Sequence, residues 1–416
     1  MKKRKLHYGW VVFVMAAFLC FFALGFTNAP KSLYLSAITE DMGFSRTAYS
    51  ISDTCRHLVY SVYVIFFGAL VAKIKPRGVA AIGFSALIAS CLISSFATAL
   101  WQFYVGGALL GIGLASTTTA LAGVFVKRWF ADHHVTLLGI TLATSGLGGA
   151  VSSPILSKII YSSSDGWRSS YRFVAILLIV VGVLELALLR NDPADVGLQP
   201  ISLSGKEKTK KRGSSWEGLD FSAVKRSPIF YVACAGVFLT GFCLQGTISS
   251  QSAHLRDIGI DQAVIATVLS VQNLSIFGAK TYTGFSHDKF GLRVTLLVCD
   301  AAAVFSLAFL GLLHAPTAAF IYSVVCAFSL PLETVMLSLI ASGLFGKNSS
   351  DKVLGVFLSM NYLGFAAGVP MVNLGYDLLG SYSPVLLILA GVMLLVGIAF
   401  QLCISASDRL RAASEE

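Results

Sequence analysis

Charged residues are scarce in this chain, and their scarcity excludes an ordinary water-soluble fold. Only 12% of the 416 residues are Asp, Glu, Lys or Arg, whereas 56% are hydrophobic. A soluble domain carries about 25% charged residues, so this chain lacks the charge needed to cover a globular surface. Its apolar surface must face something other than water, and lipid is the obvious candidate.

Motifs of redox, metal and nucleotide chemistry are also missing. The eight cysteines lie in apolar stretches and form no CxxC pair or metal-type cluster, so we interpret them as small packing residues. The segments GIG and GLGG lie inside expected spans and follow no strand, which argues against a dinucleotide loop. No Walker motif and no spaced His, Asp or Ser constellation occurs. The sequence predicts no cofactor, no metal site and no enzyme.

Long apolar runs take the place of charge. A bilayer core about 30 Å thick needs ~20 apolar residues of helix, and strands of about ten alternating residues are absent. The sequence therefore predicts an all-α polytopic membrane protein. Twelve spans are expected, at residues 9–30, 46–72, 78–99, 101–127, 134–160, 169–190, 229–252, 262–286, 292–313, 316–344, 353–377 and 383–404.

Most of the 31 Lys and Arg residues fall in loops on one side of these spans. Basic loops remain on the cytoplasmic side of a membrane, so we expect both termini in the cytoplasm, in agreement with an even number of spans. The net charge of +10 is then a topology signal, with membrane lipid as a partner, and predicts no nucleic acid. Short tails without a transit or lipidation signal favour the cytoplasmic (cell) membrane.

A polar segment at residues 191–228 divides the chain. We expect an N-terminal six-helix bundle at 1–190, a cytoplasmic linker at 191–228 and a C-terminal six-helix bundle at 229–416. One fixed offset aligns the two halves without a gap. It pairs Gly139 with Gly355, Gly148 with Gly364, Lys73 with Lys289 and Arg77 with Arg293. Two parallel repeats of six spans are typical of a transporter whose site lies between the halves, near the membrane middle.

One loop carries a recognisable signature. The segment GFSHDKFGLR, residues 284–293, resembles the pattern G-x-x-x-D-K-x-G-x-R of the major facilitator superfamily. The resemblance implies the major facilitator fold, with twelve transmembrane helices in two pseudo-symmetric six-helix bundles. It also implies that the loop, through Asp288, latches helix ends at the cytoplasmic gate. The alternative is that these charges only mark topology.

The first-half counterpart of this loop departs from the pattern. GALVAKIKPR, residues 68–77, has Ala72 in place of the acid and Lys75 in place of the second glycine. The missing acid leaves a first-half latch open to question.

Three further segments resemble the monocarboxylate transporter and oxalate:formate antiporter group. They are HYGW at 7–10, KRWFADHHVTLLG at 127–139 and SVQNLSIFGAK at 270–280. The resemblance implies a small organic anion, such as a monocarboxylate, as substrate. It also implies a proton or an exchanged anion as the second partner.

Lys280 is the leading candidate for substrate binding. A cation at mid-bilayer costs about 2.5–3.5 kcal/mol, and one that faces a central cavity recruits an anion. The resemblance implies the same role, because the group places an arginine that binds the substrate carboxylate here. Asn273 lies two turns earlier and could share the face of Lys280. The alternative is a lysine that snorkels to the cytoplasmic interface.

Other substrate contacts follow from the resemblance. Lys31 matches the lysine that meets the carboxylate at the outer end of the first span, although it could be an ordinary interfacial lysine. Asn361 stands where the antiporters place a second cation, which favours monoanions, and Tyr362 beside it could donate a hydrogen bond.

Proton coupling has two candidate locations. Asp53, Arg56 and His57 share one face of the second span, as an ion-paired gate or as a buried structural network. Glu333 follows Pro331 in the tenth span, as a proton carrier or as a counter-ion for Lys280. Proton-coupled members of the group carry an aspartate where this chain has Ile276.

These observations predict a secondary active transporter of a small organic anion, working by alternating access with proton symport or anion exchange. An exporter of drugs or other hydrophobic compounds is the alternative within the same fold. A carboxylate sensor that does not transport is the alternative from another class.

Overall fold

The computed structural model describes residues 7–131, 134–202, 220–346 and 348–415. Within these ranges the chain is helical, and its β pairing is limited to one isolated bridge between Phe130 and Ile201. The basic N-terminal residues Lys2–Lys5 and residues 203–219 of the predicted linker lie outside the described ranges.

The first half of the chain folds into eight α-helices and one π-helix. They are α1 (Tyr8–Leu19), the π-helix η1 (Cys20–Leu24), α2 (Gly25–Thr27), α3 (Ser32–Met42), α4 (Arg46–Ser95), α5 (Leu100–Thr117), α6 (Thr119–Trp129), α7 (His134–Ile160) and α8 (Gly166–Leu188).

The second half repeats the pattern after two short helices, the 3-10 helix η2 (Pro193–Val196) and α9 (Phe221–Val224). It consists of α10 (Pro228–Asp257), α11 (Gln262–Gly311), α12 (Pro316–Ser329), the 3-10 helix η3 (Leu330–Glu333), α13 (Val335–Phe345), α14 (Ser350–Leu379) and α15 (Ser383–Glu415).

Nine helical segments of the described chain are long and apolar enough to cross a membrane. Two of them, α4 and α11, have 50 residues, far more than the ~20 that one crossing needs. Each contains one residue with non-helical backbone angles, Lys75 in α4 and Gly291 in α11, where the sequence predicts a loop between two spans. The predicted all-α membrane fold is confirmed, and the count of twelve spans stays a prediction.

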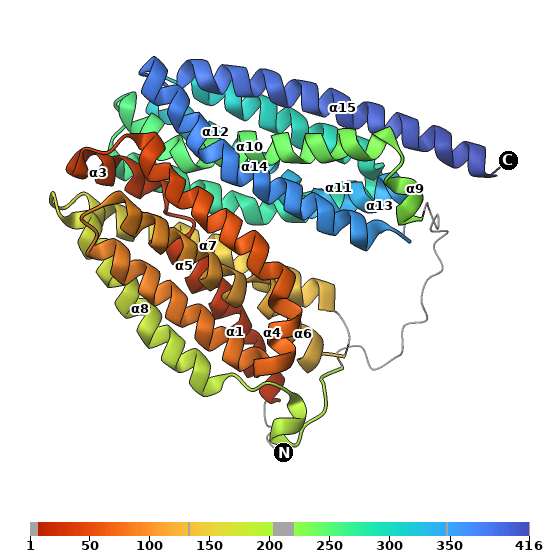
Figure 1. Ribbon diagram of the computed structural model, residues 1–416, viewed down its shortest axis with the longest axis horizontal. Coiled ribbons are helices and arrows are strands. Elements are labelled where there is room, and N and C mark those ends of the chain that lie inside the picture. Colours follow the sequence, from red (N-terminus) through yellow and green to blue (C-terminus); the bar gives the residue numbers. More distant parts are fainter. Residues whose placement is uncertain (1–6, 132–133, 203–219, 347, 416) are drawn as a thin grey trace. The chain divides into compact units, whose positions relative to one another are not determined.

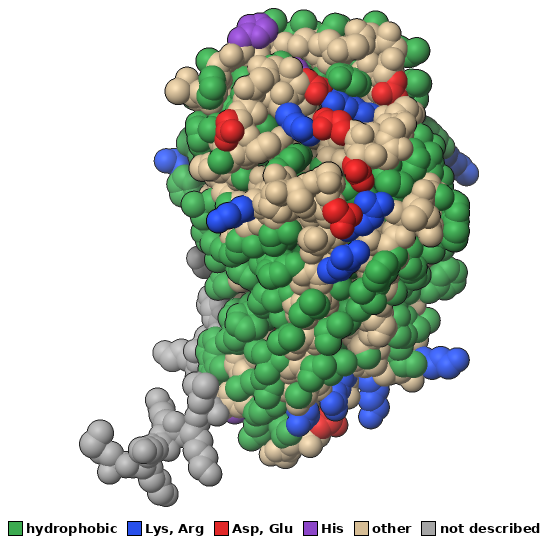
Figure 2. Space-filling model, turned by 90° about the vertical axis from the view of Figure 1, so that its left-hand side faces the viewer, with side chains coloured by type: hydrophobic (Ala, Val, Ile, Leu, Met, Phe, Trp, Pro, Cys, Tyr) green, Lys and Arg blue, Asp and Glu red, His purple; other side chains and the backbone are tan. Residues whose placement is uncertain are grey.

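The surface of the molecule is largely apolar. Large hydrophobic side chains such as Ile65 and Leu378 are 73% and 75% exposed. In the face shown in Figure 2, hydrophobic side chains cover much of the surface and charged ones are few. Such a surface is stable only against another apolar phase, which is the hydrocarbon of a bilayer.

The chain forms two compact units. Unit 1 combines Met1–Phe44 with Cys55–Lys210, and unit 2 combines Ser45–Thr54 with Lys211–Glu416. Within unit 1, α7 packs against η1, α2, α6 and α8; within unit 2, α10 packs along α14 and α15, and α11 along α12 (Figure 1). The limits predicted for the two bundles and the linker remain predictions.

Equivalent glycines allow a close helix crossing in each unit. A Cβ on Gly148 of α7 would overlap the carbonyl oxygen of Phe21, and a Cβ on Gly364 of α14 would overlap that of Phe238. Both positions therefore require a residue without a side chain, because the facing backbone leaves no room. The predicted pairing of Gly148 with Gly364 thus corresponds to matching local packing.

Alanine at either crossing glycine should destabilise the protein. We expect Gly148→Ala and Gly364→Ala to lower the free energy of unfolding by about 1–3 kcal/mol through overpacking, measured by thermal unfolding in detergent. Gly139 and Gly355 serve as matched controls on the same two helices, since an added Cβ would meet nothing within 4 Å. Equal effects at the control and crossing positions would contradict this explanation.

The two predicted loops within α4 and α11 adopt similar backbone angles. Lys75 has φ 63° and ψ 160°, and Gly291 has φ 78° and ψ 177°. This region of backbone space is almost restricted to glycine, because a Cβ clashes there with the neighbouring carbonyl. Lys75, which stands where the loop pattern has its second glycine, therefore keeps the turn geometry at a cost in strain.

Glycine at this position should relieve the strain. We expect Lys75→Gly to raise the free energy of unfolding by roughly 1–2 kcal/mol. The neighbouring change Lys73→Gly, at an exposed helical position, should lower it by ~1 kcal/mol. If both variants are destabilised alike in thermal unfolding, residue 75 is not strained in the native protein.

Candidate functional site

The tenth predicted span is broken where its acid lies. Helix α12 ends at Ser329, η3 covers Leu330–Glu333, and α13 begins only at Val335. Pro331 lacks a backbone N–H and so cannot continue the α-helical hydrogen-bond pattern. In a membrane, such irregular backbone occurs where it is buried in protein or lines a cavity. Glu333 therefore projects from a break in the helix rather than from a regular lipid-facing turn.

Lys280 of α11 and Glu333 of η3 lie close enough for their charges to interact within unit 2. Both residues are partly buried. In the described chain neither forms a hydrogen bond or ion pair through its charged atoms, and Glu333 Oε1 is buried without a hydrogen-bond partner. The two predicted residues are thus brought together without a direct hydrogen bond between them, and Glu333 Oε1 keeps acceptor capacity.

A buried polar network lies on the neighbouring helices and was missed by the sequence analysis. Gln251 of α10 donates through Nε2 to Gln272 Oε1 of α11 at 2.9 Å, and it accepts from the Tyr322 hydroxyl of α12 at 2.7 Å. Gln272 Nε2 donates to the Cys326 sulfur at 3.2 Å. The sequence could have indicated this network, because it has two glutamines within predicted apolar spans and a buried amide needs hydrogen-bond partners. The network joins α10, α11 and α12, and α12 is the helix that leads into η3.

The other residues of unit 2 that were predicted to bind substrate make contacts with their own or a neighbouring helix. Asn273 donates to the Leu269 carbonyl of its own helix at 2.8 Å. Asn361 is buried, donates to the Val237 carbonyl at 3.4 Å and lies against Gly241 of α10. The ring of Tyr362 packs edge-on against Phe365 at 5.1 Å between centroids.

Unit 1 contains a cluster of basic side chains. Arg56 and His57 are buried, and Arg56 Nη2 donates to His57 Nε2 at 2.9 Å. Arg56 Nη1 donates to Asn28 Oδ1, and the charge of Lys31 acts on His57. Because a guanidinium can only donate, His57 Nε2 is the acceptor and its ring is neutral in this contact. Lys31 therefore lies with Arg56 and His57, which were predicted as one set with Asp53. The Asp53 side chain is also buried.

The loop signature contacts its surroundings mainly through arginine. Asp288 is exposed and lies 3.7 Å from His287 Nδ1. Arg293 instead donates to Ser405 at 3.0 Å and to Asp408 at 3.3 Å on α15. In this conformation Arg293 links the loop to a neighbouring helix.

Two further acids are buried deeply in the spans. Glu185 of α8 is fully buried and Asp300 of α11 is 5% exposed. Neither carboxyl group has a hydrogen-bond partner in the described part of the chain. An ionised carboxylate without a partner is very costly in such surroundings.

Comparison with known proteins identifies the family. The sequence model of the Major Facilitator Superfamily matches residues 13–253. The chain belongs to the Major Facilitator Superfamily. The crystal structure of the nucleoside transporter NupG has the same fold, with a TM-score of 0.76 and 15% sequence identity, covering 94% of this chain and 98% of that one.

Sequence relatives of this superfamily member include anion carriers. The oxalate:formate antiporter of Oxalobacter formigenes is 22% identical over 289 residues, which cover 70% of this chain and 66% of the antiporter. Monocarboxylate transporter 13 of Rattus norvegicus is 25% identical over 332 residues, covering 79% of this chain and 73% of that protein. The relatives and structural neighbours are transporters, so this chain is a multi-pass membrane transporter and not an enzyme.

Proposed function

We propose that this transporter moves a small, monocarboxylate-like organic anion by alternating access, with proton symport or anion exchange. The observation that carries the proposal is that Lys280 and Glu333 lie close together, without a direct hydrogen bond, beside the helix break at η3. A cation at membrane depth is retained where it binds something. Two relatives whose names specify oxalate, formate and monocarboxylates support an anion as the substrate.

Charge balance explains how one site supports both modes. In the empty site Glu333 neutralises Lys280. When a carboxylate binds to Lys280, Glu333 loses its cation, and taking up a proton restores neutrality. One monoanion then moves with one proton. In exchange, a second anion replaces the first on Lys280 and no net proton moves.

The neighbouring side chains favour a single negative charge. Asn361 is neutral, and its amide already donates to the α10 backbone, so it supplies no second cation for a dianion. Asn273 and Tyr362 complete the substrate contacts of unit 2 in this proposal. In unit 1, Lys31 receives the anion, and its positive charge is reinforced by Arg56.

The remaining roles concern gating and orientation. Asp53, Arg56 and His57 form the gating set near the start of α4, and Asp288 belongs to the gate formed by the loop signature. Both termini lie in the cytoplasm and the protein resides in the cytoplasmic membrane, as the distribution of basic residues predicts.

Replacing the central lysine should abolish anion transport. In proteoliposomes, Lys280→Gln should reduce uptake of radiolabelled lactate, pyruvate or formate to background, because the neutral amide cannot hold a carboxylate. Lys280→Arg should retain uptake, since a guanidinium binds carboxylates in a bidentate manner. Lys158→Gln, at an exposed lysine of α7, controls for loss of surface charge. Uptake at the native rate in Lys280→Gln would remove Lys280 from the mechanism.

Replacing Glu333 should separate the two transport modes. Glu333→Gln cannot exchange a proton, so uptake driven by a pH gradient should be lost while exchange of internal for external carboxylate continues. Both modes are measured on the same vesicle preparation, which makes exchange the internal control for folding. Uptake in Glu333→Gln that still follows the pH gradient would assign proton coupling elsewhere.

Competition identifies the substrate class in the same vesicles. Monocarboxylates should compete with the labelled substrate more strongly than oxalate does. Competition by hydrophobic drugs, without competition by any carboxylate, would instead support the exporter alternative.

A further inference from the structure

The short helix α9 lies at one end of unit 2, beside the start of α10 and the end of α13 (Figure 1). Aromatic packing fixes it there. The ring of Phe221 contacts that of Phe230 at 6.4 Å between centroids, and Phe230 in turn contacts Phe345 at 6.0 Å. Edge-on contacts of this kind hold aromatic rings in a defined geometry. The polar side chains that α9 and its neighbours carry are therefore presented from a fixed position.

A cavity of about 570 Å³ opens between α9 and the start of α14. Its lining has three basic side chains and one acidic side chain, so positive charge is in excess. All of these residues belong to unit 2, and none of them has a role in the substrate site that we propose around Lys280. The lining consists of Asp220, Phe221, Ser222, Lys225, Arg226 and Lys352.

One aromatic ring gathers two of the ammonium groups. Lys225 Nζ lies 4.7 Å and Lys352 Nζ lies 5.8 Å from the centroid of the Phe221 ring, within the range of a cation–π contact. Within the described ranges, neither these lysines nor Arg226 form an ion pair with a carboxylate. Like charges around one ring repel each other, and an anion bound between them would remove that repulsion.

The cavity lies at the boundary of the expected membrane. Helix α10, and α14 from Lys352 onward, are each long and apolar enough to cross a bilayer. Lys225 and Arg226 lie just before the first residue of α10. Tyr231 and Val232, near the start of α10, are 62% and 45% exposed, so an apolar outer surface begins next to the cavity. An exposed tyrosine at the end of a span is typical of the headgroup region.

We propose that this cavity binds the headgroup of an anionic phospholipid. Lys225, Arg226 and Lys352 donate hydrogen bonds to the phosphate, and the acyl chains follow the exposed surface of α10 into the bilayer. A free phosphate compound would use the same three cations and leave that apolar surface unused, which favours a lipid as the occupant. The cavity lies beside the linker that the sequence predicts to be cytoplasmic, and anionic lipids are abundant in the cytoplasmic leaflet.

Lipid binding at this position has a structural consequence. A phosphate that bridges Lys225 and Lys352 links the segment after α9 to the first turn of α14. Because a ligand that binds only the folded state raises its stability, an anionic lipid should stabilise the protein against thermal unfolding. The site goes beyond the proposed transport function, since neither binding nor stabilisation requires a transported solute.

Removal of the three cations should weaken lipid binding. Purified protein in detergent is titrated with phosphatidylglycerol, and native mass spectrometry gives the dissociation constant of the tightest lipid. Lys225→Gln and Lys352→Gln should each raise this constant about fivefold, and the triple variant that also has Arg226→Gln about a hundredfold, because each basic residue contributes separately to the attraction. Phosphatidylcholine with the same acyl chains should bind the native protein and the triple variant alike.

Lys289 provides the matched control within unit 2. Its Nζ lies 5.2 Å from the ring centroid of Phe290 and 5.8 Å from that of Phe285, but it does not line the cavity. A control triple variant, with glutamine at the exposed residues Lys73, Lys127 and Lys289, removes the same formal charge. It should change the dissociation constant by less than about twofold. Equal weakening in the two triple variants would mean that the lipid responds to net charge alone, and would overturn the site.

Thermal unfolding of the same samples identifies the source of the phosphate. Phosphatidylglycerol should raise the melting temperature of the native protein and leave that of the cavity triple variant unchanged, whereas millimolar inorganic phosphate should affect neither. An unchanged dissociation constant in the cavity triple variant would overturn the proposal. Stabilisation by inorganic phosphate that this variant loses would overturn the lipid as occupant and assign the cavity to soluble phosphate compounds. Failure of carboxylate uptake concerns the proposed function alone, since neither measurement here involves transport.

Discussion

The cost of placing a charge in hydrocarbon organises the polar residues of this transporter. Each ionised group at membrane depth must find an opposite charge, a hydrogen-bond partner or water, since an isolated one costs several kcal/mol. Lys280 lies near Glu333, Arg46 near Asp257, and Arg56 against Asn28 and His57. In the first two pairs the partners come from separate helical segments, so the requirement that pairs the charges also favours contact between those segments.

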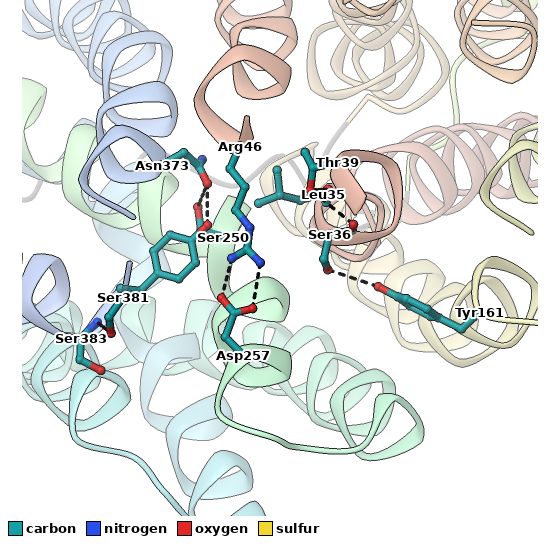
Figure 3. A network of polar contacts seen from close by, with 11 residues as sticks. Leu35, Ser36, Thr39, Arg46, Tyr161, Ser250, Asp257, Asn373, Ser381 and Ser383 are labelled. Carbon is teal, nitrogen blue, oxygen red and sulfur yellow. Dashed lines mark hydrogen bonds and ion pairs between the residues drawn. The ribbon is translucent and has the colours of Figure 1, made fainter. Parts of the chain in front are cut away.

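The charged pairs differ in whether their partners are directly hydrogen-bonded, and this difference distinguishes a structural contact from a candidate transport site. Arg46 and Asp257 form a bidentate pair through both terminal nitrogens and both carboxylate oxygens (Figure 3), and Tyr376 and Tyr382 add to the contact. Such a pair favours one conformation. Lys280 and Glu333 interact without a direct hydrogen bond, and one carboxylate oxygen has no partner in the described chain. A pair of this kind retains capacity for an anion and a proton, as a transport site requires.

The two halves preserve backbone requirements better than side-chain chemistry. Gly148 and Gly364 occur where the backbones of two helices leave no space for a Cβ, and the turns at Lys75 and Gly291 have similar angles although one residue is a lysine. Charge is distributed differently, because Lys280 and Glu333 lie in unit 2 and the Lys31, Arg56 and His57 cluster lies in unit 1. The two units thus share backbone features and differ in the charged side chains that they carry.

The sequence by itself determined the class of fold, because hydrophobic run length and the placement of basic loops are local properties that a bilayer imposes directly. It also identified Lys280, Glu333, Arg56 and His57 as candidates, since a charge inside an apolar run is visible without a structure. Tertiary structure alone decided which of them meet. It showed the Gln251–Gln272–Tyr322 network, the attachment of Arg46 to Asp257, and the assignment of Ser45–Thr54 to the second unit. These features depend on contacts between residues far apart in the chain, and no local pattern encodes such distances.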